Sequence, residues 1–184
     1  MAVSSLPGAL LLCLDMQAAF LAALPEREVV IRRCRFAISA TRGIGLKVAF
    51  TEQVPQKLGS TLPELLELTE QPVQLGKSTF SALADDGIAE TVRGLDVEHL
   101  ILCGIETPIC VYQTAIDALN ANLQVTLLSD AIGARRPDDA RYALDALTRS
   151  GVHVLPSETI FYSLLHGARH PFFRSFTELV KTHG

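Results

Sequence analysis

The sequence predicts an α/β fold in which a largely parallel sheet of six strands is covered by helices on both faces. Three observations support this prediction. Short apolar runs alternate along the chain with longer stretches of helical periodicity, an order typical of strand–helix–strand units. The apolar runs are continuous, as in strands that are buried on both faces. The helical stretches between them provide the crossover connections that parallel strands require.

The first part of the chain predicts three strands and two helices. Residues 9–15 (ALLLCLD) form a continuous apolar run that ends in an acid. Residues 26–43 have apolar positions at helical spacing and stop at a glycine, which favours a helix end. Residues 46–52 (LKVAFTE) predict the second strand, residues 61–69 a short helix, and residues 72–77 (PVQLGK) a brief third strand.

The middle of the chain continues the alternation. Residues 85–94 predict a helix, with either of its first two residues, both aspartate, as the N-cap. Residues 98–104 (EHLILCG) predict the fourth strand. Residues 108–122 predict a helix with proline in its first turn, and residues 123–131 (LQVTLLSDA) the fifth strand.

The last part predicts one more strand between helices. Residues 137–151 predict a helix that starts at proline and is followed by glycine. Residues 152–156 predict the sixth strand, and residues 157–165 a helix that Ser157 caps. Residues 172–181 predict a final helix that packs by its phenylalanines.

Length and composition set limits on the class of protein. A chain of 184 residues predicts one domain, over residues 1–184. The net charge of −4 argues against a nucleic-acid surface, and we interpret the arginine clusters at 32–35 and 135–136 as solvated faces. The apolar run at 9–14 is too short for a signal peptide or a membrane span. We therefore expect a cytoplasmic protein with no membrane or nucleic-acid partner.

The cysteines and histidines do not predict a metal site. A cytoplasmic protein keeps its thiols reduced, and the chain contains no C-x-x-C pair and no zinc-ligand spacing of histidines. We expect Cys13, Cys34 and Cys103 to be buried packing residues, because free cysteine is among the most buried residue types.

Three chemically active residues follow predicted strands. Asp15, Lys77 and Cys110 stand at or beyond the ends of the first, third and fourth strands, and the carboxyl ends of parallel strands are where α/β folds place their sites. At the start of a helix, the Cys110 thiolate would be favoured by the helix dipole and by Lys77. Asp15 would accept the thiol proton. From the residues alone, an acyl-transfer site and plain packing both remain open.

Longer segments give the chain a family resemblance. LLCLDMQAAF, KSTFSAL and the stretch from LILCGIETPICVYQTA to RRPDDARYAL resemble the isochorismatase-like cysteine hydrolase superfamily, over about residues 9–165. TEQVPQKLGSTLPEL and SETIFYSLL resemble its isochorismatase-domain-containing branch. The resemblance implies a Rossmann-like, three-layer α/β/α sandwich with a six-stranded sheet. It also implies a catalytic triad of Asp15, Lys77 and Cys110.

The resemblance implies further features of the site and of the assembly. A cis peptide bond is expected between Ile105 and Glu106. The backbone N–H groups of Glu106 and Cys110 are expected to form an oxyanion hole. A homo-oligomer, a dimer or larger, is also implied. The expected substrate pocket consists of Gln17, Phe20 and Thr107.

Departures from the family pattern narrow the function. Nicotinamidases of the superfamily bind a metal after the second strand, but here Glu52 and Gln53 stand there with no histidine, so we expect no metal and no cofactor. Some relatives carry a ribonuclease label, which the negative net charge does not support. We expect a hydrolase that cleaves a C–N bond of a small amide or carbamoyl compound through a Cys110 thioester. The alternatives are a non-catalytic ligand-binding or scaffold protein and a redox-active thiol.

Overall fold

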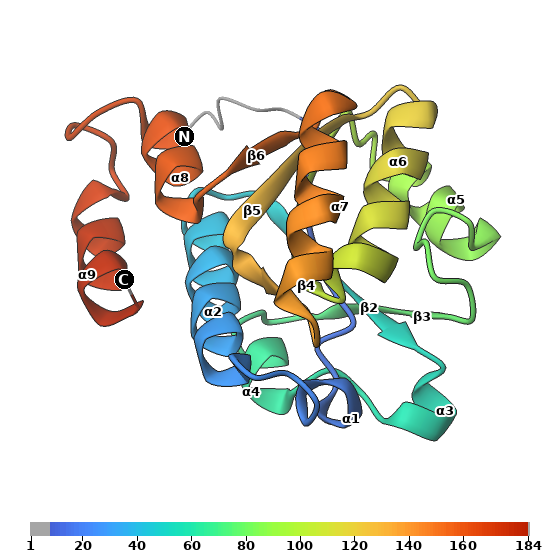
Figure 1. The fold of residues 1–184 in the computed structure, drawn as a ribbon. Helices are drawn as coiled ribbons and strands as arrows, with labels where there is room; N and C mark the ends of the chain where they lie inside the picture. The colour runs from blue at the N-terminus through green and yellow to red at the C-terminus, as the bar shows by residue number, and fades with distance from the viewer. Residues whose placement is uncertain (1–7, 184) are drawn as a thin grey trace.

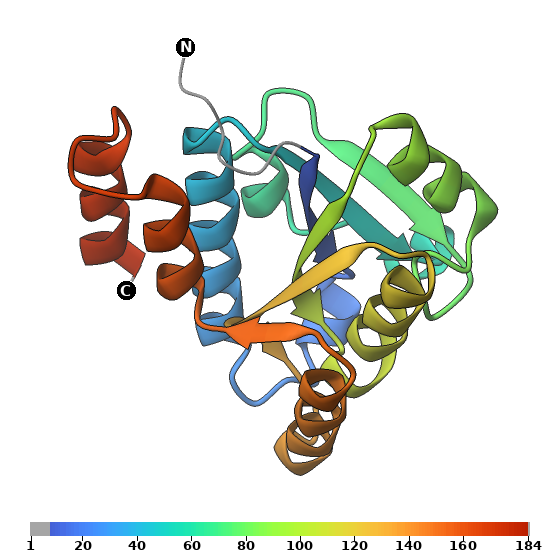
Figure 2. The same cartoon turned by 90° about the horizontal axis from the view of Figure 1, so that it is seen from above.

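The computed structural model describes residues 8–183 and contains a six-stranded sheet between two layers of helices (Figures 1 and 2). Every neighbouring pair of strands in it is parallel. The predicted three-layer α/β/α sandwich is therefore confirmed. The strands lie in the order β3 (Val73–Lys77), β2 (Lys47–Gln53), β1 (Ala9–Leu14), β4 (His99–Ile105), β5 (Gln124–Gly133) and β6 (His153–Leu155).

Longer helices cover the two faces of this sheet (Figure 1). One face packs against α2 (Arg27–Gly43), α8 (Ser157–Leu165) and α9 (Phe173–His183). The other face packs against α5 (Asp86–Gly94), α6 (Tyr112–Asn120) and α7 (Pro137–Arg149). Three helices of a single turn occupy connecting segments: α1 (Ala18–Leu21), α3 (Pro55–Leu58) and α4 (Pro63–Leu66).

Strand β1 shows why its sequence is apolar at every position. Leu11 and Cys13 belong to the core on the α2 side, whereas Leu10 and Leu12 belong to the core on the α6 side. Successive side chains of a strand point to opposite faces, so a central strand between two helical layers has no solvated face. The continuous apolar run is the consequence.

Aromatic rings attach the C-terminal helix to the fold. Phe176 of α9 lies 5.7 Å from Phe36 of α2 and 6.3 Å from Phe161 of α8, measured between ring centroids. All three side chains are fully buried. The predicted helix that packs by its phenylalanines is thus confirmed.

Most predicted elements agree with the structure, and the differences occur in short segments. Asp85 is the N-cap of α5, because its side chain accepts hydrogen bonds from the N–H groups of Gly87 and Ile88. The helix expected at 61–69 is reduced to α4, and the single turns α1 and α3 were not predicted. Such short turns lack the periodic pattern by which longer helices are recognised.

The expectation that Ser157 caps α8 is wrong. Pro156 is the N-cap residue, and Ser157 instead uses its backbone N–H and its hydroxyl to donate to the carboxylate of Asp130. Arg33 donates to the same carboxylate and lies 2.8 Å from the Ser157 hydroxyl. Arg33 is buried by these contacts, so the interpretation of residues 32–35 as a solvated face is wrong at this position.

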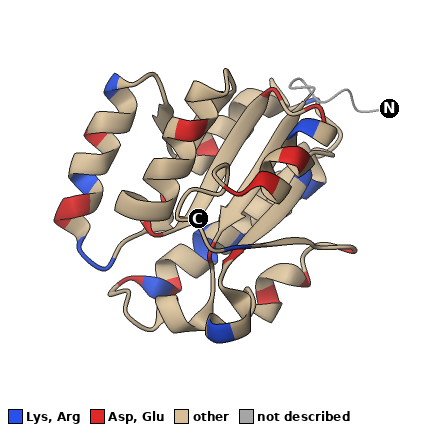
Figure 3. Ribbon diagram, turned by 90° about the vertical axis from the view of Figure 1, so that its right-hand side faces the viewer, with Lys and Arg blue, Asp and Glu red and all other residues tan. Residues whose placement is uncertain are grey.

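No helix within residues 8–183 is long and apolar enough to cross a membrane. Lysine and arginine positions alternate with acidic ones over the face seen in Figure 3. The cytoplasmic location and the single domain over 1–184 stay predictions, and residues 1–7 and 184 of that domain lie outside the described residues.

Candidate active site

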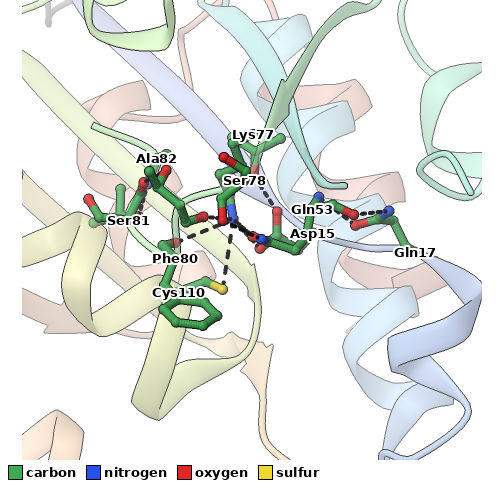
Figure 4. Close-up of polar contacts among 12 residues, drawn as sticks. Asp15, Gln17, Gln53, Lys77, Ser78, Phe80, Ser81, Ala82 and Cys110 are labelled. Atoms are coloured by element: carbon green, nitrogen blue, oxygen red, sulfur yellow. Dashed lines mark hydrogen bonds and ion pairs between the residues drawn. The ribbon is translucent and has the colours of Figure 1, made fainter. Parts of the chain in front are cut away.

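The sheet brings the three candidate residues to one edge (Figure 4). The strand order reverses between β1 and β4, which are neighbours in the sheet. Asp15 follows β1, Lys77 ends β3, and Cys110 lies in a single π-helical turn, η1 (Thr107–Val111), that follows β4 and leads into α6. Their position agrees with the rule that ligands bind beyond the carboxyl ends of strands at the reversal point.

Gly104 allows β4 to approach β1 closely at this point. Its φ is +105°, and a Cβ atom added there would lie 2.2 Å from the carbonyl oxygen of Leu14. No side chain fits at such a distance, and L-residues rarely adopt this φ. The glycine that ends the apolar run in the sequence therefore fixes the junction from which Asp15 and η1 extend.

Asp15 and Lys77 form a buried ion pair. Lys77 Nζ lies 2.8 Å from Asp15 Oδ2, and neither side chain is accessible to solvent. The other carboxylate oxygen of Asp15 accepts a hydrogen bond of 2.7 Å from the Thr51 hydroxyl. Charges are buried in proteins only when they are paired and hydrogen-bonded, and this pair meets both conditions.

Gln53 is a member of the site that the sequence did not predict. Its Oε1 accepts a hydrogen bond of 2.5 Å from Lys77 Nζ, and its Nε2 donates to the carbonyl of Ser78 at 3.0 Å. Gln53 is the last residue of β2, so it reaches the same edge as Asp15. The sequence signal that could have identified Gln53 as a site residue was its position at the end of a strand.

Cys110 lies beside this ion pair as a neutral thiol. Its Sγ is 3.8 Å from Lys77 Nζ. Burial and the negative charge of Asp15 raise the pKa of Cys110 to about 12, although Lys77 and a hydrogen bond from the Glu106 backbone lower it. Lys77 therefore favours the thiolate, as expected, but burial and Asp15 have the larger effect, and the thiol stays protonated in the resting site.

Asp15 and Cys110 line a cavity of about 340 Å³, whereas Lys77 is not among its lining residues. Gln53 and Glu106 add polar atoms to the lining, and Arg135 contributes a cation. Phe80 also lines the cavity, although 58% of this residue is exposed. The remaining walls are mainly apolar and include Ala19, Phe20, Ala23, Leu24, Ile105 and Ile109.

Of the three predicted pocket residues, Phe20 lines this cavity and the other two do not. Gln17 accepts from the Gln53 backbone N–H at 2.8 Å and donates to the Gln53 and Gly59 carbonyls. Thr107 is buried, and its hydroxyl donates to the Gly133 carbonyl at 2.9 Å. The backbone thus uses the polar atoms that were expected to contact substrate, and contact of Gln17 and Thr107 with substrate stays a prediction.

The turn before Cys110 is held by Arg135. The peptide bond between Ile105 and Glu106 is cis, at the position that the resemblance implies. The Glu106 carboxylate accepts from the backbone N–H of Arg135 at 2.9 Å and from its Nε at 3.0 and 3.1 Å. Arg135 was interpreted as part of a solvated face, but it contacts both this turn and the cavity.

Glu52, near the end of β2, is held by protein hydrogen bonds. Glu52 Oε1 accepts from the Thr61 backbone N–H at 2.8 Å and from Gln74 Nε2 at 2.9 Å. Neither Glu52 nor Gln53 has a histidine neighbour in the sequence. These donors match a structural role for Glu52 in holding the α3–α4 segment.

The chain is similar to known proteins over most of its length. An isochorismatase domain matches residues 9–159. Isochorismatase domain-containing protein 2 of Bos taurus is 35% identical over an alignment that covers 96% of this chain and 85% of the relative. Isochorismatase domain-containing protein 1 of Salmo salar is 31% identical, with 92% of this chain and 59% of the relative covered. The chain therefore spans less than two thirds of the Salmo salar protein.

The fold is also similar to a solved structure. The MAR1 ribonuclease from Caenorhabditis elegans superposes with a TM-score of 0.88 and is 30% identical, and the match covers 95% of this chain and 90% of that one. Both the sequence relatives and this structure agree with the resemblance drawn from the motifs.

Proposed function

The chain belongs to the isochorismatase domain family, and from that premise we propose that it is a cysteine hydrolase that cleaves a C–N bond of a small amide or carbamoyl compound. The observation that carries the proposal is the meeting of three groups beside one cavity. Lys77 Nζ lies 2.8 Å from Asp15 Oδ2 and 3.8 Å from Cys110 Sγ, and both Asp15 and Cys110 line the cavity. A nucleophile beside an oriented base is the arrangement that covalent catalysis requires.

In the first step of the proposed reaction, the Cys110 proton passes to Asp15 while Sγ attacks the substrate. Sγ forms a bond to the carbonyl carbon, and the backbone N–H groups of Glu106 and Cys110 stabilise the oxyanion. The C–N bond then breaks, and the amine or ammonia leaves with the proton from Asp15. Water, deprotonated by Asp15, attacks the thioester carbon, the C–S bond breaks, and the acid product leaves. Asp15 then returns its proton to Sγ, which restores the thiol. Lys77 holds the Asp15 side chain in position through the cycle.

The resting state of the thiol supports the role of Asp15 as the base. Because the pKa of Cys110 is raised to about 12, a thiolate is scarce at neutral pH. The proton must therefore leave as the carbon–sulfur bond forms, and the neighbouring carboxylate provides the acceptor. This mechanism differs from that of an activated thiolate next to a cation.

The cavity supports a small substrate with an apolar acyl group. Its volume of about 340 Å³ and its mainly alkyl and aromatic walls suit a compact molecule. The Arg135 side chain is paired with Glu106, which leaves no unpaired cation on the described walls for a phosphate or carboxylate. A nucleic-acid substrate, as the name of the C. elegans ribonuclease indicates for that protein, is disfavoured by the net charge of −4.

The test is a hydrolysis screen over small aliphatic and aromatic amides and carbamoyl compounds, with detection of the released amine. Quenched reactions are analysed by mass spectrometry for an acyl group on Cys110. The proposal expects turnover that disappears in Cys110→Ala and in Asp15→Asn. Asp145→Asn, which changes an exposed acid on α7, is the matched control and keeps full activity.

Two results would support the alternatives instead. Tight binding of an untransformed compound, with no turnover across the screen, would favour a ligand-binding or scaffold protein. Rapid peroxide oxidation of Cys110 to sulfenic acid would favour a redox role, but its raised pKa argues against that reactivity. The family resemblance also implies a homo-oligomer, which light scattering in solution measures.

A further inference from the structure

The second cluster of reactive side chains in the described chain is a set of three buried thiols. Cys13, Cys34 and Cys103 come from β1, α2 and β4, and their Sγ atoms all lie within 4.8 Å of one another. We propose that these three thiols form a binding site for trivalent arsenic, which they hold as a neutral trithiolate. This site is separate from Cys110 and does not depend on the proposed hydrolase activity.

The fold itself creates this convergence. Cys13 and Cys103 are register partners on neighbouring parallel strands, so their side chains point to the same face of the sheet. That face packs against α2, and Cys34 contributes the third sulfur from the helix. The Cys34 thiol donates to the carbonyl oxygen of Ala131 at 3.3 Å. The sulfurs therefore form a triangle between sheet and helix.

The size of the triangle fits one central atom. Thiolate bonds to zinc are about 2.3 Å long, which places three sulfurs around one atom roughly 4 Å apart when they are coplanar with it. Bonds from arsenic to sulfur have a similar length, and its pyramidal geometry brings the sulfurs somewhat closer. The observed limit of 4.8 Å thus needs a contraction that rotation of the three side chains can provide.

Charge selects trivalent arsenic over the usual thiophilic metals. All three cysteines are at most 1% exposed and belong to the apolar core on the α2 side. Three thiolates leave a charge of −2 around Cu(I) and −1 around Zn(II), and an unpaired buried charge is strongly disfavoured. The cations Lys77 and Arg33 are already paired with Asp15 and Asp130. Arsenic(III) with three thiolates carries no charge.

The binding reaction also needs no counter-ion or oxidant. Arsenous acid, As(OH)₃, is a small neutral molecule at neutral pH. Three S–H bonds and three As–O bonds break, three As–S bonds form, and each thiol proton leaves with a hydroxide as water. Arsenic stays trivalent and every sulfur keeps its oxidation state. A neutral reagent and a neutral product are compatible with an apolar interior, which opens by local fluctuation to admit a small solute.

The test incubates the reduced full chain with sodium arsenite and no other thiol, followed by native mass spectrometry. The expected adduct has one arsenic per chain, with a mass gain equal to arsenic minus three hydrogens. X-ray absorption at the arsenic edge should then find three sulfur neighbours and no oxygen. Cys110→Ala should bind arsenite like the unchanged protein. An adduct that disappears in Cys110→Ala, or that forms only in urea, would overturn the proposal.

Two variants that each remove one thiol test two of the three ligands. Cys34→Ala and Cys103→Ala keep only two cluster thiols, so arsenic should retain one hydroxyl and its affinity should fall by more than about tenfold, because the third sulfur acts at high effective concentration. Circular dichroism checks that each variant is folded. If Cys34→Ala does not fold, Cys34→Ser takes its place. Unchanged affinity in the folded variants contradicts the site, as does preferential binding of zinc(II) from an equimolar mixture with arsenite.

Discussion

Lys77 Nζ lies 2.8 Å from Asp15 Oδ2 at a depth where neither side chain meets solvent. The same ammonium also donates to Gln53 Oε1 and lies 3.8 Å from Cys110 Sγ. A buried ion pair contributes little net stability compared with apolar packing, but removal of one partner is costly. The pair is therefore better explained by what it positions than by what it stabilises.

Lys77→Met should destabilise the protein by about 3–5 kcal/mol, because it leaves the Asp15 carboxylate buried without its counter-ion. Urea unfolding measures the loss. The double variant Lys77→Met/Asp15→Asn removes both charges and should recover part of it. Lys181→Met is the matched control: Lys181 lies the same 2.8 Å from Glu178, but both are exposed, so the change should be at most about 1 kcal/mol. Equal losses at the two lysines would contradict the buried-pair argument.

The pH dependence of stability should report the Cys110 thiol. Its pKa is raised from 9.0 to about 12, so the folded state holds the thiol proton more tightly than the unfolded state. The resulting stability is fully present below pH 9 and is lost as the pH rises toward 12. In this window the free energy of unfolding should fall more steeply with pH in the unchanged protein than in Cys110→Ala. The difference in slope should reach up to about 1.4 kcal/mol per pH unit. Parallel curves for the two proteins would show that the thiol has an ordinary pKa.

Alkylation rates should separate the two charges that act on Cys110. The charge of Asp15 raises the pKa of the thiol and that of Lys77 lowers it. At pH 8, iodoacetamide should therefore modify Cys110 faster in Asp15→Asn and more slowly in Lys77→Met, since the thiolate is the reactive form. Peptide mapping measures the rates, and Asp145→Asn should match the unchanged protein. A change of the same sign in both variants would refute this assignment of causes.

The six-stranded parallel sheet and the neighbourhood of Asp15, Lys77 and Cys110 follow from local patterns. Apolar runs, helical periodicity and strand-end positions all point to the same fold, and parallel topology then brings three strand ends together. The pKa of Cys110 does not follow, because it depends on burial and on the distance to Asp15 rather than on chain position. The effect of the helix terminus on the pKa of Cys110 was overestimated for that reason, because it was judged from chain position alone.

The residues whose contacts differ from the expected ones share one physical cause. Gln17 and Thr107 were expected to contact substrate, but nearby backbone groups take their polar atoms. Arg33 was expected in solvent, but Asp130 is close in space and 97 positions away in the sequence. The cysteine triangle escaped detection in the same way, since its members come from three separate elements. Spacing rules detect ligands on one segment, and these contacts are made between segments.

Gly104→Ala should destabilise the protein by at least about 3 kcal/mol, because the new methyl group would overlap the backbone of Leu14 and the positive φ disfavours any L-residue. Denaturant unfolding measures the loss. Gly94→Ala is the matched control, since nothing lies within 4 Å of a Cβ atom there and alanine favours the helix. A loss at Gly104 no larger than the change at Gly94 would mean that β1 and β4 can separate without cost.

Phe176→Ala should cost about 3–5 kcal/mol, because it leaves a cavity among the rings of Phe36, Phe161 and Tyr162. Phe176→Leu fills most of that space and should cost less. None of these rings lines the cavity beside Cys110, so both variants should retain the kcat of the unchanged protein at temperatures where they are folded. Thermal unfolding measures the loss of stability, and steady-state kinetics measures kcat. A lower kcat in fully folded Phe176→Ala would mean that α9 affects the site through the α2 layer. The inference that this aromatic core does not influence the cavity would then be wrong.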